Sequence, residues 1–121
     1  MDCSKISSPA FVLDEKLLRK NLELINQVQQ EAGIEIILAF KGFAMWSTFP
    51  LVRQYLSGAT ASSLFEARLC FEEMKTRAHV YSPVYFENEF EELMSYSSHI
   101  VFNSINQFNK FYTETKKADR P

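Results

Sequence analysis

The chain contains few of the residues that mark several protein classes. Its 121 residues include 2 cysteines, 3 glycines and 4 prolines. Two cysteines, Cys3 and Cys70, are too few for a disulfide framework, and neither belongs to a metal-ligand cluster, so reduced thiols and no metal are expected. The low glycine and proline content excludes collagen-like and low-complexity chains.

An excess of basic residues and a long apolar run are also missing. The chain has 13 Lys and Arg against 15 Asp and Glu, a formal net charge of -2, so nucleic acid is not expected as a partner. No apolar run approaches the roughly 18 residues of a membrane span, and the first residues lack the basic and apolar regions of a signal peptide. The sequence therefore predicts a soluble, cytoplasmic protein that does not bind membranes.

The residues that are present are those of a globular domain. Hydrophobic residues make up 46% and aromatic residues 14% of the chain, enough for a core, and 23% are charged. This composition excludes intrinsic disorder as the main description. The length fits one domain or a part of a larger one.

Helical and strand patterns alternate along the chain. A first helix is predicted from an N-cap at Asp14 to a C-terminal Gly33, after an extended stretch from Pro9 to Leu13. The nearly continuous apolar run Ile34–Phe40 is typical of a parallel strand covered on both faces. The remaining predictions are a helix from about Thr48 to Leu56, a strand at 59–62, a helix with apolar positions from Leu64 to Met74, a strand at 79–81, a helix around Phe90, a strand at 100–102 and a helix around Phe108.

The spacing of the strands predicts an α/β fold of compact βα units. Strands begin near residues 36, 59, 79 and 100, at intervals of roughly twenty residues. Four parallel βα units form an open sheet or half of a closed (β/α)8 TIM barrel, which needs about 250 residues. We therefore expect half of a barrel, and truncation is the simplest interpretation of the missing half.

Polar and small residues lie in or just after the carboxyl ends of the predicted strands, where the functional surface of parallel α/β folds lies. They are Lys41, Thr60, Ser62, Ser63, Ser82, Asn103 and Ser104. Lys41 is the most informative, because an amine that leaves a buried strand loses water and its pKa falls. Such an amine can form a Schiff base with an aldehyde such as pyridoxal phosphate. The alternative is a lysine that simply extends from the strand end into water.

The segment LAFKGFAMWSTFPL, Leu38–Leu51, resembles the cofactor-lysine segment of carboxynorspermidine (carboxyspermidine) decarboxylases. This family belongs with ornithine and diaminopimelate decarboxylases and alanine racemase among the barrel-type pyridoxal phosphate enzymes. Three later segments, Gly58–Leu69, His79–Pro83 and His99–Ser104, agree in the same order. The resemblance covers nearly the whole chain.

The resemblance implies a pyridoxal 5'-phosphate-dependent carboxy-lyase of polyamine (norspermidine and spermidine) biosynthesis. Its substrate is a carboxylated triamine, carboxynorspermidine or carboxyspermidine, and the full-length family works as a homodimer. Residues 1–121 then form the N-terminal part of the alanine racemase-like barrel domain, without the rest of the barrel and the C-terminal β domain. Lys41 is the implied Schiff-base residue and proton carrier.

The resemblance also implies cofactor contacts for four residues in and after the second strand. Thr60, Ser62, Ser63 and Glu66 are candidates for lining the cofactor pocket, with helix capping or surface exposure as the alternative interpretation. The family's phosphate loop and ring-stacking histidine belong to later strands, so little activity is expected from this chain alone. His79 and His99 are predicted at the amino ends of their strands, in structural roles, and Cys70 is predicted to pack.

Two other functions stay open from the sequence. One is a barrel protein that binds pyridoxal phosphate for storage or delivery without decarboxylation. The other is a small doubly wound interaction domain whose lysine is incidental. Absorbance of bound pyridoxal phosphate distinguishes the interaction domain from both kinds of pyridoxal phosphate protein. Release of carbon dioxide distinguishes the storage or delivery protein from the enzyme.

Overall fold

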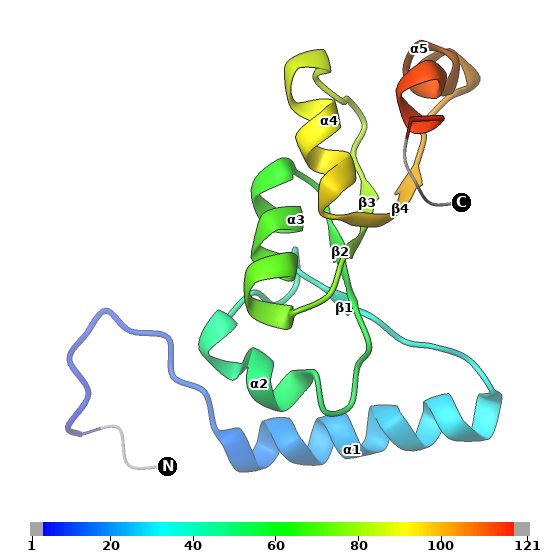
Figure 1. Cartoon of the computed structure of the whole chain (residues 1–121). Helices are drawn as coiled ribbons and strands as arrows, with labels where there is room; N and C mark the ends of the chain where they lie inside the picture. Colours follow the sequence, from blue (N-terminus) through cyan, green and yellow to red (C-terminus); the bar gives the residue numbers. More distant parts are fainter. Residues whose placement is uncertain (1–3, 118–121) are drawn as a thin grey trace.

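The computed structural model describes residues 4–117 and has helices alternating with parallel strands (Figure 1). The strands are β1 (Leu38–Ala39), β2 (Ala59–Ala61), β3 (Ala78–Tyr81) and β4 (Ser97–Val101). The helices are α1 (Glu15–Ala32), η1 (Trp46–Thr48), α2 (Phe49–Val52), α3 (Leu64–Leu69), η2 (Cys70–Met74), α4 (Glu87–Ser95) and α5 (Ile105–Thr115).

The four strands form one sheet in the order β1-β2-β3-β4, and every pair is parallel. Each strand therefore lies beside the next strand along the chain, as in successive units of a (β/α) barrel. Figure 1 shows α3 and α4 on one side of the sheet and α1 running past the amino ends of the strands. The predicted α/β class with four parallel βα units is confirmed.

The core lies between the sheet and the helices on that side. Side chains alternate along a strand, and Ala61, Val80 and Ala78 point toward the helices with at most 1% of their surface exposed. The largest buried side chains of the core are Phe49 and Phe90. The Phe90 ring of α4 stacks on Phe111 of α5 with centroids 4.2 Å apart, so α5 packs on the same core.

The opposite side of the sheet is uncovered among residues 4–117. Its side chains are exposed or half-buried although they belong to strands. We call this surface the open face; its residues are Ala39, Thr60, His79, Tyr81, His99 and Val101. In a closed barrel this surface lines the interior.

The first strand is shorter than predicted. Instead of Ile34–Phe40, only Leu38–Ala39 forms regular strand, and Ile34 is exposed. β1 lies at the edge of the sheet and has β2 as its one partner, through bonds such as Leu38 N–H to the Gly58 carbonyl at 2.9 Å. Coverage on both faces was therefore wrongly predicted: Leu38 is half-buried and Ala39 is exposed.

Some helix boundaries differ from the predictions. The predicted helix over 48–56 ends as α2 at Val52. The next helix passes from α3 into a π turn, η2, and ends at Met74, before the cap residue Lys75, whose φ of 58° is left-handed. The ends of α1 are as predicted: the Asp14 side chain accepts from the N–H groups of Lys16 and Leu17, and Gly33 has a φ of 64°.

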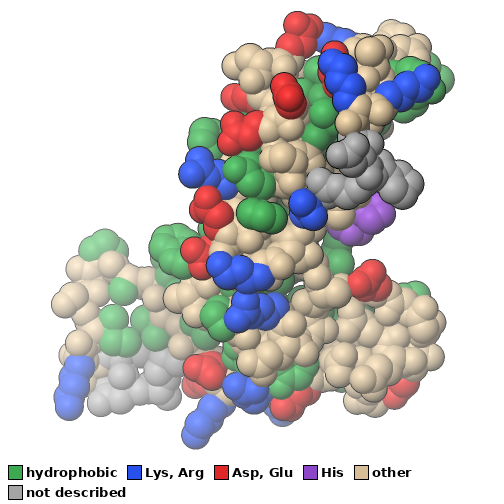
Figure 2. Space-filling model, viewed as in Figure 1, with side chains coloured by type: hydrophobic (Ala, Val, Ile, Leu, Met, Phe, Trp, Pro, Cys, Tyr) green, Lys and Arg blue, Asp and Glu red, His purple; other side chains and the backbone are tan. Residues whose placement is uncertain are grey.

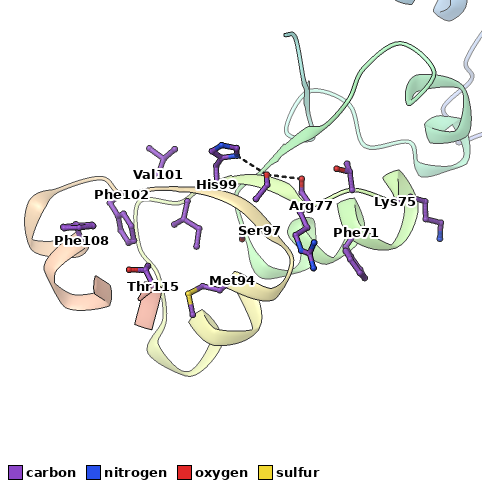
Figure 3. A pocket seen from close by; sticks show the side chains of 13 residues that line it. Phe71, Lys75, Arg77, Met94, Ser97, His99, Val101, Phe102, Phe108 and Thr115 are labelled. Atoms are coloured by element: carbon purple, nitrogen blue, oxygen red, sulfur yellow. Dashed lines mark hydrogen bonds between the residues drawn. The ribbon is translucent and has the colours of Figure 1, made fainter. Parts of the chain in front are cut away.

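Strand β4 leaves its outer edge unpaired within residues 4–117. An open groove follows this edge (Figure 3) and is lined by apolar side chains that include Met94, Phe102 and Phe108. Lys75 and Arg77 lie at its other end. The described residues include no helix that is long and apolar enough to span a bilayer.

Candidate functional site at the carboxyl edge of the sheet

Lys41 lies in a tight turn directly after β1. The Ala39 carbonyl accepts from the N–H groups of Gly42 at 2.9 Å and Phe43 at 3.1 Å, which reverses the chain. The buried Phe40 ring stacks on Phe49 with centroids 5.2 Å apart and fixes the base of the turn. Lys41 itself is exposed, so the predicted loss of water from this amine is wrong for the described residues, because nothing in them covers the open face.

The Lys41 amine faces another strand rather than bulk water alone. Its Nζ lies 6.0 Å from the ring centroid of Tyr81 on β3, at the outer limit of a cation–π contact. Tyr81 Oη in turn donates to Asn103 Oδ1 at 3.2 Å. An amine, a phenol and an amide from the ends of three strands therefore meet at the carboxyl edge.

Tyr81 is a site residue that the sequence analysis missed. The signal was present in the alternation along β3, because Val80 is buried and its neighbour must point the other way. Thr60, a predicted site residue, lies on the same face but one row lower, in register with Ala39 and His79. Thr60 therefore lies on the open face, and Lys41 reaches the same face through its contact with Tyr81.

Ser63 and Glu66 cap helix α3. Ser63 Oγ accepts from the Glu66 N–H at 3.2 Å, and Glu66 Oε2 accepts from the Ser62 N–H at 2.6 Å. In a capping box, the N-cap residue and the residue three positions later each accept from the other's backbone N–H. Here Glu66 accepts from Ser62, the residue before the N-cap, instead of from Ser63. Helix capping, the structural alternative for these two residues, is confirmed as one role that they perform.

Helix α5 begins with the same arrangement. Ser104 Oγ accepts from the Gln107 N–H at 3.2 Å, and Gln107 Oε1 accepts from the Asn103 N–H at 2.6 Å. Free N–H groups at a helix start are a common site for phosphate. At α3 and α5 the N–H groups of Ser62 and Asn103 already bond to side chains of their own helix.

Ser62 and Ser63 line a small pocket between α3 and α4. Ser82, Tyr85 and Glu89 are among the other lining residues, whereas Lys41 and Thr60 are not. The structure thus divides the predicted site residues into two groups. Lys41 and Thr60 lie on the open face, and Ser62, Ser63 and Glu66 lie around the start of α3.

Tyr85 holds the carboxyl ends of β3 and β4 together. Its Oη accepts from the Ser82 N–H at 3.1 Å and donates to the Val101 carbonyl at 2.8 Å. The side chain is buried, and this burial raises the pKa of Tyr85. The ends of these strands are therefore fixed, and they carry Tyr81 and Asn103.

Cys70 agrees with its prediction, whereas the position of His99 in its strand does not. Cys70 is buried as predicted, and burial raises its pKa to about 11, so its thiol is not a nucleophile at neutral pH. His99 lies within β4 and not at its amino end, because this strand begins at Ser97. The pKa of His79 is lowered, first because its ring is half-buried and then because His99 lies beside it. The charge of Glu35 acts in the opposite direction.

Sequence comparison relates the chain to a set of bacterial decarboxylases, although no family model matches it. It is 46% identical over 113 residues to the carboxynorspermidine/carboxyspermidine decarboxylase of Campylobacter jejuni, covering 93% of the chain and 30% of the relative. It is 45% identical over 115 residues, 95% of the chain and 30% of the relative, to carboxyaminopropylagmatine decarboxylase of Synechocystis sp.. A third relative, from Herminiimonas arsenicoxydans, is a carboxynorspermidine/carboxyspermidine decarboxylase that is 40% identical over 88% of the chain and 29% of its own length.

A solved structure gives the same result. The crystal structure of carboxynorspermidine decarboxylase from Campylobacter jejuni, complexed with norspermidine, matches with a TM-score of 0.88 over 93% of the chain and 30% of that protein. This chain is homologous to carboxynorspermidine/carboxyspermidine decarboxylases. It spans about 30% of the length of these decarboxylases.

The likeness to the decarboxylases confirms the resemblance that the sequence motifs predicted. Four parallel strands in sequential order, matched to part of a decarboxylase, agree with the predicted partial barrel. The positions of Lys41, Tyr81 and Asn103 at one edge of this partial barrel add support for a functional proposal.

Proposed function

We propose that this chain supplies the lysine-bearing part of a carboxy-lyase that removes carbon dioxide from a carboxylated triamine in polyamine biosynthesis. The observation that carries the proposal is the close match to the Campylobacter jejuni decarboxylase, at 46% identity and a TM-score of 0.88. The exposed amine of Lys41 at the carboxyl edge of the sheet supports it, because this edge is where parallel α/β folds bind their ligands.

The proposed cofactor is pyridoxal 5'-phosphate, with Lys41 as its covalent attachment point. When bound, this cofactor supplies an electron sink for the pair left by a departing carboxylate. The open face fits the aldehyde end, since the Lys41 amine is accessible there and the Tyr81 ring lies 6.0 Å away. The phosphate would need donors from elsewhere, because the Ser62 and Asn103 N–H groups are occupied.

The residues of this chain would act mainly by holding and positioning groups. Lys41 Nζ would accept and return a proton near the reacting carbon, and the Tyr81 ring would stabilise the ammonium form between these steps. Thr60 would contact the cofactor from the open face. Ser62, Ser63 and Glu66 would do so from the start of α3, in addition to their capping bonds.

The proposed substrate class is a polyamine that carries a carboxylate. Relatives named for carboxynorspermidine, carboxyspermidine and carboxyaminopropylagmatine share this chemistry. We propose carboxynorspermidine or carboxyspermidine for this chain. The homodimer and the cytoplasmic location stay predictions.

Reductive trapping tests the proposed role of Lys41. The 121-residue chain would be incubated with pyridoxal 5'-phosphate and reduced with borohydride, and labelled peptides would be quantified by mass spectrometry. We expect the label predominantly on Lys41, and its loss in Lys41→Arg. Lys110, an exposed lysine paired with Glu87 at 2.7 Å, provides the internal comparison. Equal labelling of Lys41 and Lys110 would refute a special role for Lys41.

Carbon dioxide release then distinguishes an enzyme from a cofactor-storage protein. A complete protein containing this sequence should release carbon dioxide from carboxynorspermidine and should lose this activity in Lys41→Ala. Trapping on Lys41 without release in the complete protein would favour storage or delivery. The 121-residue chain alone should show little or no turnover, because it spans about 30% of its relatives.

A further inference from the structure

His79 and His99 form a pair of imidazoles on the open face. They lie on the neighbouring strands β3 and β4, directly opposite each other in register. Their ring centroids are 4.1 Å apart and their planes are inclined by 37°. His99 is exposed and His79 is half-buried, and histidine side chains reach the surface in Figure 2.

A bulge in β4 produces this pairing. Ala78 pairs with Ser97, but the next residue, His79, pairs with His99, so Ser98 is the extra residue. A regular ladder would place Ser98 opposite His79. Bulges characteristically re-aim a side chain, and this one brings the second imidazole beside the first.

Ser98 also contacts one ring nitrogen of His99. Ser98 Oγ donates its proton to the backbone, to the Ala78 carbonyl at 3.2 Å or the Arg77 carbonyl at 3.4 Å. His99 Nδ1 lies 3.2 Å from the same oxygen, and a dashed line in Figure 3 marks the hydrogen bond of His99. When Ser98 donates to either carbonyl, its Oγ accepts from Nδ1–H of His99. The lone pair of His99 is then on Nε2.

This arrangement has the features of half a metal site. Imidazole nitrogens bind late first-row divalent ions, and a ligand histidine usually donates its other N–H to a neighbouring oxygen. Ser98 provides that oxygen, and His79 provides a second imidazole in the adjacent position. Residues 4–117 contain no cluster of three or more His, Cys, Asp or Glu able to hold a metal, so water would complete the coordination.

We propose that His79 and His99 together bind a divalent late first-row metal ion, for which Zn2+ is the probe. Each imidazole contributes one nitrogen, that of His99 being Nε2. Two protein ligands make a weak and exchangeable site. The site uses neither Lys41 nor a cofactor, so it stands or falls independently of the proposed decarboxylase function.

Histidine NMR provides the direct test, because the sequence contains only these two histidines. Zn2+ would be titrated into the Cys3→Ser chain, which removes a competing thiol. We expect both histidine ring Cε1–H signals to shift together, at a stoichiometry of one ion per chain. Shifts of neither signal, or of one alone, would overturn the proposal without the need for a variant.

Calorimetric titration of variants tests the ligands and the positioning residue. His79→Asn and His99→Asn should each abolish the zinc-binding heat, and Ser98→Ala should weaken binding about tenfold because it releases the His99 ring. Tyr81→Phe, on the same face, should bind zinc as the parent does. Circular dichroism would confirm that each variant is folded. Folded histidine variants that bind zinc as tightly as the parent would contradict the assignment.

Discussion

At the scale of single residues, Tyr85 is the side chain that most directly connects the sheet to the candidate site. It is buried and bonds to both strand ends that carry Tyr81 and Asn103. A phenylalanine would keep the ring contacts with Phe90, Phe102 and Phe111. Only the hydroxyl is then removed, which isolates the contribution of its hydrogen bonds.

We therefore expect Tyr85→Phe to lower the free energy of unfolding by about 1–3 kcal/mol, because the Ser82 N–H and the Val101 carbonyl lose their partner. Urea unfolding followed by circular dichroism measures this change. Tyr81→Phe is the matched control: it removes one bond at an exposed position and should change stability by less than about 0.5 kcal/mol. Equal losses in the two variants would disprove the role of Tyr85.

At the scale of elements, the repeated helix starts at α3 and α5 follow directly from the sequence. Ser63 and Glu66, and likewise Ser104 and Gln107, have the three-residue spacing of a reciprocal cap. The hydroxyl accepts from an N–H in the first turn, and the longer side chain accepts from the N–H just before the N-cap. The local pattern therefore determines where these helices begin, and both begin beside the candidate site.

Ser63→Ala should cost about 1 kcal/mol of stability, since the Glu66 N–H loses its acceptor at the start of a short helix. Ser104→Ala should have a similar effect at α5. Ser47→Ala, at an exposed position in η1, should change the urea midpoint little. If Ser63→Ala resembled Ser47→Ala, the cap would not contribute to stability.

Local sequence patterns predicted the presence of helices and strands well, but they predicted the length of the strand at the sheet edge poorly. The caps of α1 at Asp14 and Gly33 were predictable because neighbours in sequence supply the bonds. The length of β1 was not, because its hydrogen bonds depend on β2 and on the absence of a partner at its other edge within residues 4–117. The position of His99 depended on a bulge, which the alternation of side chains does not reveal.

At the scale of the whole molecule, the burial of Cys70 in the core makes the free energy of unfolding depend on pH in the alkaline range. Burial raises the pKa of Cys70 from its ordinary 9.0 to about 11. The unfolded chain therefore loses this proton at lower pH than the folded chain, and the free energy of unfolding falls as pH rises from 9 towards 11. Tyr85, whose pKa is also raised by burial, should add to the decline.

Urea unfolding across this pH range, in a Cys3→Ser background, measures the effect. Cys70→Ala should be less stable at neutral pH, because it leaves a gap in the core, but should lose less stability on going to alkaline pH. Parallel curves for the two chains would show that Cys70 ionisation does not contribute. The comparison needs no functional assay.

The site could be predicted only in part, because it depends on surfaces that meet across the whole sheet. Lys41 was predictable from its position after an apolar strand, and its placement at the carboxyl edge agrees. Its exposure was not, since that depends on what lies against the open face. The contacts of Tyr81 with Lys41 and Asn103 join three strands and leave no local pattern in the sequence.

The two sides of β3 differ in a way that selection experiments could detect. Ala78 and Val80 are fully buried, whereas His79 and Tyr81 lie on the open face. Random mutagenesis scored by folding of this chain alone should show tolerance at every second position. Where another polypeptide segment rests on the open face, all four positions should become intolerant, so the loss of that period-two pattern would reveal the contact genetically.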